Sequence, residues 1–152
     1  MPTVSTRPAL IDDLPTIVGL LADDVLGQGR ENISPPLHSD YFDAFEAIDD
    51  DPNQVFVVFE SEGVIIGCLQ LSFIPGLSQQ GAWRGQIESV RISSERRGAG
   101  LGQEMISRAI DTCRERGCQI IQLTSDKARK DAAEFYRALG FVASHEGFKQ
   151  TI

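Results

Sequence analysis

Six residues near the middle of the chain, RGAGLG at 97–102, limit most strongly what this sequence can fold into. They follow a strand-like run at 86–92 and open a helix-like run that extends from 98 to about 116. Three glycines in this turn let the backbone bend tightly and approach a ligand without interference from a Cβ atom. The first amides of a helix lack internal partners and lie at the positive end of the helix dipole. The turn therefore predicts a site for an anion such as a pyrophosphate.

The composition fits a single soluble, globular domain covering residues 1–152. Hydrophobic residues make up 41% of the sequence and charged residues 24%, and a chain of this length buries a core without disulfides. There is no apolar run of about 18 residues, so no membrane-spanning helix is expected. The first residues, MPTVS, lack the basic and apolar regions of a signal peptide, which favours a cytoplasmic location.

The charged and metal-binding residue types argue against two kinds of partner. The net charge of −8 argues against nucleic acid, which requires a basic surface. His38 and His145 have no second histidine or cysteine at ligand spacing, so we expect no metal. Cys68, Cys113 and Cys118 are typical of reduced thiols. Acidic clusters in the first third of the chain suit a cationic substrate, or form only a solvated surface.

Hydrophobic periodicity predicts a mixed α/β domain with the element order β-α-α-β-β-β-α-β-α-β. A largely antiparallel first half followed by a β-α-β second half implies a central mixed sheet with helices on both faces. Strands are expected at 3–7, 54–60, 64–73, 86–92, 119–124 and 141–149. Helices are expected from 12 or 13 to about 26, at 40–48, from 98 to about 116, and at 131–139.

Glycine-rich turns that bind phosphate between a strand and a helix follow several known sequence patterns, three of which bear on residues 97–102. The dinucleotide pattern G-x-G-x-x-G is not matched, because residues 98–102 read G-x-G-x-G and lie past the middle of the chain. The phosphate loop of nucleotide hydrolases fails as well, since no Gly-Lys pair follows Gly98 at the required spacing. The pattern R-x-x-G-x-G/A is matched in every required position from Arg97 to Gly102.

In its context this last pattern resembles the GNAT superfamily of acetyl-CoA-dependent N-acyltransferases. The resemblance follows the order of elements over nearly the whole chain and is sharpest from Ile87 to Lys149. It rests on the strand IESVRI at 87–92, the glycine turn, the helix segment AAEFY at 132–136 and LGF at 139–141. The tail at 144–149 resembles the last strand of many bacterial members. The second half resembles the aminoalkylphosphonate acetyltransferase branch.

The resemblance implies acetyl-CoA as cosubstrate and assigns the residues that bind it. The pyrophosphate would lie on the main-chain amides of the glycine turn, with Arg97 at its mouth. The pantetheine arm would pair like an added strand with the backbone of Val90 and Ile92. A strand amide near Val90 would hold the thioester oxygen. The predicted cofactor-binding residues are Val90, Arg91, Ile92, Arg97, Gly98, Ala99, Gly100, Leu101, Gly102 and Tyr136.

Glu88 is the candidate general base. Attack on a thioester requires a neutral amine, so a base or a water relay must deprotonate an alkylammonium group near neutral pH. A strict two-residue period would place Glu88 on one face with Val90 and Ile92, roughly 7 Å from the amide that holds the carbonyl. That distance favours action through a bridging water. Alternatively, Glu88 pairs with Arg84 or Arg91 and only shapes the site.

Tyr136 is the candidate general acid, because family members usually protonate the departing thiolate from a tyrosine on the last helix. The alternative is a packing residue beside Phe135. No cysteine falls on the active-site strand, so we expect direct transfer without a covalent intermediate. The chain departs from the family at Arg129, where many members carry an asparagine that contacts the cofactor. With Lys127 and Lys130, Arg129 could meet the 3′-phosphate of CoA or form a solvated basic loop.

The predicted function is transfer of an acetyl group from acetyl-CoA to the primary amine of a small molecule. Acceptor specificity is expected from residues 27–41, the loop at 75–85 and the tail. The acidic first half favours polyamine-like cations over a phosphonate. The main alternative is a GNAT-fold sensor that holds an acyl-CoA without turnover, and a nucleotide-binding regulatory domain is another. The sequence is compatible with a homodimer.

Overall fold

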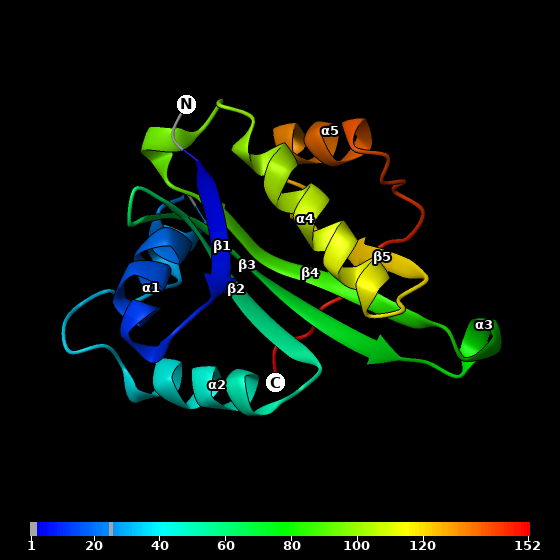
Figure 1. The fold of residues 1–152 in the computed structure, drawn as a ribbon, viewed down its shortest axis with the longest axis horizontal. Helices are drawn as coiled ribbons and strands as arrows, with labels where there is room; N and C mark the ends of the chain where they lie inside the picture. Colours follow the sequence, from blue (N-terminus) through cyan, green and yellow to red (C-terminus); the bar gives the residue numbers. More distant parts are fainter. Residues whose placement is uncertain (1–2, 25) are drawn as a thin grey trace.

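The computed structural model describes residues 3–24 and 26–152 and is organised around one mixed sheet, in the strand order β1-β2-β3-β4-β5 (Figure 1). Neighbouring strands from β1 to β4 are antiparallel, whereas β5 lies parallel to β4. Only the parallel pair requires a long crossover, and a helix supplies it. The strands are β1 (Val4–Pro8), β2 (Gln54–Ser61), β3 (Val64–Pro75), β4 (Trp83–Ile92) and β5 (Ile120–Leu123).

Helices pack on both faces of this sheet. The helices are α1 (Leu14–Ala22), α2 (Ser39–Asp50), the single turn α3 (Ser78–Gly81), α4 (Leu101–Glu115) and α5 (Lys130–Ala138). On one face, Met105 of α4 packs in a buried cluster with Leu71 of β3. On the other face, Ile17 of α1 and Phe45 of α2 pack with Cys68 of β3. Alternate residues of β3 therefore serve two separate cores, as the predicted mixed fold requires.

Helix α4 confirms the amphipathic pattern at 98–116. Its buried residues recur every three or four positions, which places them on one face of a helix: Leu101, Met105, Ile106, Ala109 and Cys113. The helix ends where Gly117 adopts a φ of 80° and donates its amide to the Arg114 carbonyl at 3.0 Å. The predicted first turn of the helix is instead the glycine turn, and the helix proper begins at Leu101.

The predicted last strand, at 141–149, is wrong. The described chain forms no strand after β5, and the segment crosses behind the sheet as seen in Figure 1. The Ser144 amide donates to the Val142 carbonyl at 2.9 Å, a tight turn that interrupts an extended ladder. Phe148 is 90% exposed, so its apolar side chain is not drawn into either core. The alternating pattern was present, but alternation by itself does not form a strand without a main-chain ladder to a neighbour.

Most other boundaries lie within a few residues of their predicted positions. The first helix is shorter than expected, since a 3-10 turn at Ile11–Asp13 leads into α1, which ends at Ala22. The expected continuation through residue 25, and the N-terminal residues 1 and 2, lie outside the described part of the chain.

No described helix combines the length and the apolar character needed to span a bilayer.

The close approach of α4 to β4 predicts a packing defect if Gly85 gains a side chain. A Cβ atom built on Gly85 collides with the Sγ atom of buried Cys113 and lies 3.3 Å from its Cβ. We therefore expect Gly85→Ala to destabilise the fold by about 1–3 kcal/mol. Gly29→Ala is the matched control, because no atom lies within 4 Å of a Cβ built there. Urea unfolding should show a lower midpoint for the first variant alone, and equal midpoints would contradict this packing.

Candidate active site

A β-bulge interrupts β4 at the candidate site and changes the direction of the strand. The register of β3 and β4 shifts by one residue between the pairs Cys68–Arg91 and Gln70–Glu88. Ser89 lies inside this shift and has a φ of 55°, a left-handed conformation that is uncommon for serine. Such an extra residue bends a strand and increases its twist. The second half of β4 is therefore redirected relative to the first half.

Beyond this bulge, β4 has an open edge. The parallel ladder with β5 covers only Arg84 to Ile87, although β4 continues to Ile92 and remains paired with β3. Two carbonyls of this stretch accept hydrogen bonds from arginine side chains. The Val90 carbonyl accepts from Arg91 Nη1 at 2.9 Å, and the Ile92 carbonyl accepts from Arg97 Nε at 3.3 Å. Main-chain groups on the β5 side of this stretch lack a ladder partner in the described chain. Such free main-chain groups can hydrogen-bond an extended ligand as an added strand would.

The bulge also overturns one expectation about Glu88. Val90 and Ile92 pack against the core cluster that includes α4. Arg91 lies opposite Cys68, whose side chain belongs to the cluster that includes α1. Glu88 lies opposite Gln70, which is two positions after Cys68 on β3. Glu88 is therefore on the same face of the sheet as Cys68. The predicted common face with Val90 and Ile92 is wrong, because one extra residue reverses the two-residue alternation.

The glycine turn has the conformation that the sequence predicted. Gly98 and Gly100 adopt φ values of 84° and 80°, which glycine enters without steric cost, and α4 begins directly afterwards at Leu101. No side chain of the described residues caps this helix start. The amides of Ala99 to Gly102 therefore lie at an uncapped, positive helix end that fits a phosphate group.

Two predicted cofactor residues of the turn also make contacts within the protein. Arg97 donates from Nη2 to the Asp23 carbonyl at 2.8 Å and from Nε to the Ile92 carbonyl, so it ties the turn to the end of α1. Gly102 lies against Ile92 and Phe135, and a Cβ there would be 3.2 Å from an atom of each. The arginine thus holds the turn in place. The third glycine allows close packing of α4.

Tyr136 projects from α5 and is half-buried. Its ring makes edge-to-face contacts with Phe135 and Phe141, at centroid separations of 5.2 and 5.8 Å. Burial raises the pKa of its hydroxyl above the ordinary value, although the charges of Arg129 and Arg91 oppose that rise. The hydroxyl is therefore protonated at neutral pH and can donate a hydrogen bond.

Arg91 and Arg129 converge on a single carboxylate. Asp24 Oδ2 lies 3.3 Å from Arg91 Nε and 3.8 Å from Arg129 Nη1. The Asp24 and Arg91 side chains are only 14% and 13% exposed. Burial by itself raises the pKa of Asp24, but the hydrogen bond from the Gly27 amide and the charges of Arg91, Arg129 and Arg30 hold that pKa below its usual value. The cluster joins the end of α1, β4 and the start of α5.

This cluster changes the interpretation of two basic residues. Arg91 was predicted to bind the cofactor, and its guanidinium reaches Asp24 on the face away from α4. Arg129, at the N-cap of α5, stands where the resemblance expects asparagine and is directed toward the same carboxylate. Lys127 and Lys130 remain exposed. A contact from Arg129 to a CoA phosphate would compete with its ion pair.

The cluster predicts a pH-dependent loss of stability in Asp24→Asn. A carboxyl whose pKa is lowered in the fold stabilises the folded state above its unfolded pKa, near 3.9, and loses that effect as the pH falls through the folded value. We expect the variant to be about 2 kcal/mol less stable at pH 7, and the difference to shrink toward pH 3. Asp23→Asn is the control, since that side chain is 46% exposed and its ion pair is 3.8 Å long. Urea unfolding across this pH range tests the prediction, which a constant difference between the two proteins would contradict.

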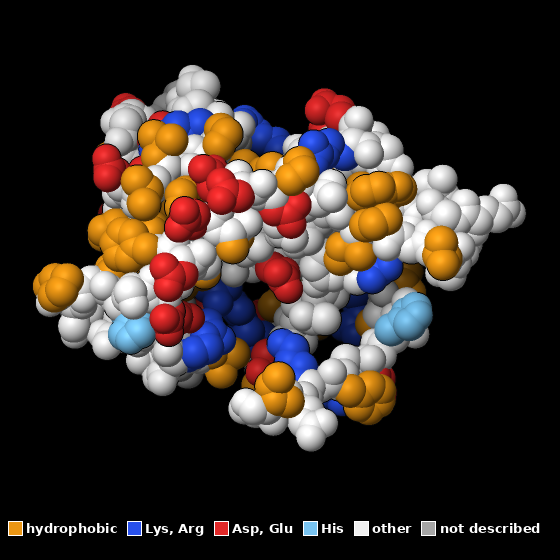
Figure 2. Space-filling model, turned by 90° about the horizontal axis from the view of Figure 1, so that it is seen from below, with side chains coloured by type: hydrophobic (Ala, Val, Ile, Leu, Met, Phe, Trp, Pro, Cys, Tyr) orange, Lys and Arg blue, Asp and Glu red, His pale blue; other side chains and the backbone are white. Residues whose placement is uncertain are grey.

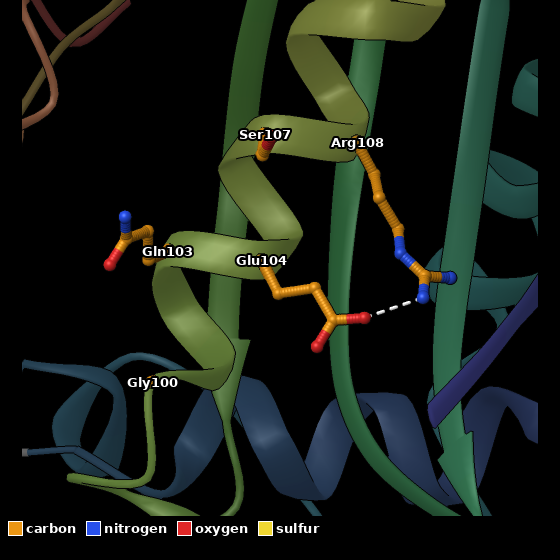
Figure 3. Close-up of a pocket in the computed structure, with 5 residues that line it drawn as sticks. All are labelled: Gly100, Gln103, Glu104, Ser107 and Arg108. Atoms are coloured by element: carbon orange, nitrogen blue, oxygen red, sulfur yellow. Dashed lines mark hydrogen bonds and ion pairs between the residues drawn. The ribbon is translucent and has the colours of Figure 1, made fainter. Parts of the chain in front are cut away.

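Two shallow hollows flank the glycine turn. The first lies on the outer side of α4, where Glu104 and Arg108 form an ion pair at 2.5 Å and point away from Gln103 (Figure 3). Its lining residues are Gly100, Gln103, Glu104, Ser107 and Arg108. The second lies between α1 and the sheet and is lined by Thr16, Gly19, Leu20, Ala22, Asp23, Ile33, Ile65 and Ser93. Neither hollow includes Glu88 or Tyr136.

Among the described residues, no group of three or more His, Cys, Asp or Glu is placed to hold a metal.

Two residues of the site were not singled out from the sequence. Ser89 lies in a run that reads as a regular strand, and its left-handed φ has no local sequence signal. Asp24 lies in one of the acidic clusters of the sequence without a local signal for this role, and its partners are distant in the chain. A glycine at position 89 would have marked the bulge, but a serine does not.

A strand with an open edge that leads into a glycine turn and a helix is the arrangement that the resemblance implies for an acyltransferase. The family model described as "Acetyltransferase (GNAT) family" matches residues 23–141. The chain therefore belongs to the GNAT acetyltransferase family and is an acyltransferase by class.

Individual relatives and solved structures are similar over nearly the whole chain. The aminoalkylphosphonate N-acetyltransferase of Salmonella typhimurium is 25% identical over 152 residues, covering 100% of this chain and 94% of the relative. A solved structure described as a transcriptional regulator from Bacillus halodurans C-125 has 47% identity and a TM-score of 0.95, covering 99% of this chain and 100% of that chain. A predicted acetyltransferase from Clostridium acetobutylicum, solved with acetyl-CoA, shares the fold at 20% identity and a TM-score of 0.74, covering 98% of this chain and 96% of that chain.

Proposed function

We propose that this protein transfers the acetyl group of acetyl-CoA to the primary amine of a small molecule, in one step within a ternary complex. The observation that carries the proposal is the open edge of β4 directly before the glycine turn. The edge offers main-chain hydrogen bonds to the amides of a pantetheine arm, and the helix start offers amides to a pyrophosphate. The related fold solved with acetyl-CoA supports the same donor.

In the proposed reaction, the amine nitrogen attacks the carbonyl carbon of the thioester. A C–N bond forms, the C–S bond breaks, the nitrogen loses one proton and the departing thiolate gains one. A β4 amide near Val90 stabilises the negative charge that develops on the carbonyl oxygen. Burial raises the pKa of Cys68 on β3 to about 12, so its thiol is not a nucleophile at neutral pH. This supports direct transfer to the amine.

Glu88 accepts the proton of the amine through a bridging water in this proposal. Its side chain is exposed and lies on the sheet face away from α4, whereas Val90 packs toward α4. The amine therefore approaches from the α1 side of β4. This arrangement separates the acceptor and its base from the helix that carries the glycine turn.

Tyr136 supplies the proton or hydrogen bond to the departing sulfur. It comes from α5, whose Phe135 packs against Gly102 beside the glycine turn. Because burial keeps its hydroxyl protonated, Tyr136 can act as a donor throughout the neutral range. Its edge-to-face contacts with Phe135 and Phe141 hold the ring in place.

Release of free CoA thiol from acetyl-CoA in the presence of a panel of amines tests the proposal. We expect thiol release that depends on the amine, with an N-acetylated product of the corresponding mass. Binding of acetyl-CoA without thiol release for any amine would overturn the catalytic assignment. Failure of acetyl-CoA to bind would overturn the assignment of the glycine turn as well.

A second candidate is a regulatory module that binds an acyl-CoA and does not turn it over. It is favoured by one observation, the similar structure that is described as a transcriptional regulator. The same assay separates the two candidates, because the module predicts saturable acetyl-CoA binding with no amine-dependent thiol release. The exposed carboxylate of Glu88 and the protonated hydroxyl of Tyr136 favour the enzyme.

A further inference from the structure

A row of uncharged polar side chains crosses the sheet face opposite α4. Gln54 of β2 lies opposite Ser72 of β3, Ser72 lies opposite Gln86 of β4, and Gln86 lies opposite Gln122 of β5. Residues directly opposite one another share a face, so one continuous line of these side chains spans four strands. Gln70, two positions before Ser72 on β3, lies on the same face. We call these five residues the glutamine row.

The row is partly bonded within itself. Gln54 Oε1 accepts from Gln70 Nε2 at 3.1 Å and from Ser72 Oγ at 2.7 Å. Gln122 Nε2 donates to Gln86 Oε1 at 2.7 Å. Each of these bonds uses one end of a carboxamide, so the opposite ends of Gln70, Gln86 and Gln122 remain available for a further hydrogen bond. The row thus presents fixed donors and acceptors without net charge.

The glutamine row lies next to the proposed base. Gln70 lies opposite Glu88, and both side chains are on the same face of the sheet as Gln86. The apolar cluster under α1 and α2 occupies the part of this face around Val58 and Cys68, so the polar part begins where that cluster ends. The C-terminal segment crosses the same side of the sheet (Figure 1), and the surface seen from below is hollowed, with acidic and basic side chains at its border (Figure 2).

We propose that the glutamine row binds the body of the acceptor, and that this acceptor is a primary amine on an uncharged, hydroxyl-rich scaffold such as an amino sugar. This inference rests on the proposed acetyl transfer. A hydroxyl both donates and accepts, and a carboxamide can satisfy both functions at once. Neutral amides do not compensate the second ammonium of a polyamine or the charge of a phosphonate, which require ionised partners. The single ammonium would instead meet Glu88, which lies two positions from Gln86 on β4 and opposite Gln70.

Steady-state acetylation of three probes tests this inference: D-glucosamine, spermidine and 2-aminoethylphosphonate. We expect kcat/KM to be at least about tenfold higher for D-glucosamine than for either charged amine. Gln122→Leu should raise the KM for D-glucosamine about tenfold and leave the KM for acetyl-CoA unchanged. Gln122 is exposed, so this change should not prevent folding. Gln119→Leu is the matched control, since Gln119 is an exposed glutamine that precedes β5 and lies outside the row.

Two results would overturn the inference while leaving the proposed function intact. One is a preference for spermidine or 2-aminoethylphosphonate, and the other is an equal KM for D-glucosamine in the Gln122→Leu and Gln119→Leu variants. If no amine is acetylated, the proposed function fails, and calorimetric titration of D-glucosamine into the protein loaded with CoA decides the row separately. Binding weakened by Gln122→Leu and not by Gln119→Leu supports the row as a binding surface. Absence of such binding overturns it.

Discussion

Replacement of Glu88 by glutamine is expected to lower kcat about 100-fold at pH 7 and to leave acetyl-CoA affinity unchanged. Glutamine keeps the size of the side chain and its place opposite Gln70, but it cannot accept a proton. An alkyl amine with a pKa near 10 is almost entirely protonated at neutral pH, so the variant has little free nucleophile. As the pH rises toward that value, solvent delivers more neutral amine. The deficit of the variant should therefore shrink at high pH.

The pH dependence of kcat for the wild type and Glu88→Gln, measured by thiol release, checks this expectation. Glu115→Gln is a matched control, because Glu115 is an exposed glutamate at the end of α4. A deficit that stays constant from pH 7 to pH 10 would show that Glu88 shapes the site and does not act as a base. A change confined to the KM of the amine would assign it to acceptor binding.

Replacement of Tyr136 by phenylalanine is expected to lower kcat more than tenfold with little change in acetyl-CoA affinity. The substitution removes only the hydroxyl and preserves the edge-to-face contacts of the ring with Phe135 and Phe141. The departing thiolate then lacks a nearby donor, which raises the barrier for breaking the C–S bond. A donor thioester whose thiol is more acidic should recover part of the rate, because it needs less protonation.

Calorimetric titration with acetyl-CoA and a thermal unfolding curve serve as controls for Tyr136→Phe, and both should match the wild type. An unchanged kcat would remove Tyr136 from the mechanism and leave it the packing role that its ring contacts describe. The loss of kcat should be similar from pH 7 to pH 9, because burial raises the pKa of the wild-type hydroxyl and keeps it protonated over that range.

Local sequence patterns were enough to predict the elements that carry their own signals. Gly98 and Gly100 marked a turn with positive φ, and the apolar spacing from Leu101 to Cys113 marked the helix that follows. Both signals lie within a few residues of the feature that they predict. The run at 141–149 had similar alternation but forms no main-chain ladder with a neighbouring strand, so the same reasoning was wrong there.

The orientation of the candidate catalytic groups could not be predicted in this way. Ser89 carries no glycine-like signal, yet its left-handed φ places Glu88 on the face opposite Val90. Arg91 was predicted to bind the cofactor, and Arg129 to contact a CoA phosphate or to lie in a solvated loop, whereas the fold places both guanidinium groups beside Asp24. The partners in these contacts are separated by tens of residues, so only the folded chain brings them together.

The sequence by itself determined the glycine turn, the helix that starts after it and the resemblance to an acyltransferase family, because main-chain conformation and amphipathic spacing are local properties. Tertiary structure alone decided which face of β4 carries Glu88, where β5 separates from β4, and how the glutamines of β2 to β5 align in one row. Those features depend on strand register. Register is set by pairing between distant segments, and a one-residue shift moves every following side chain to the opposite face.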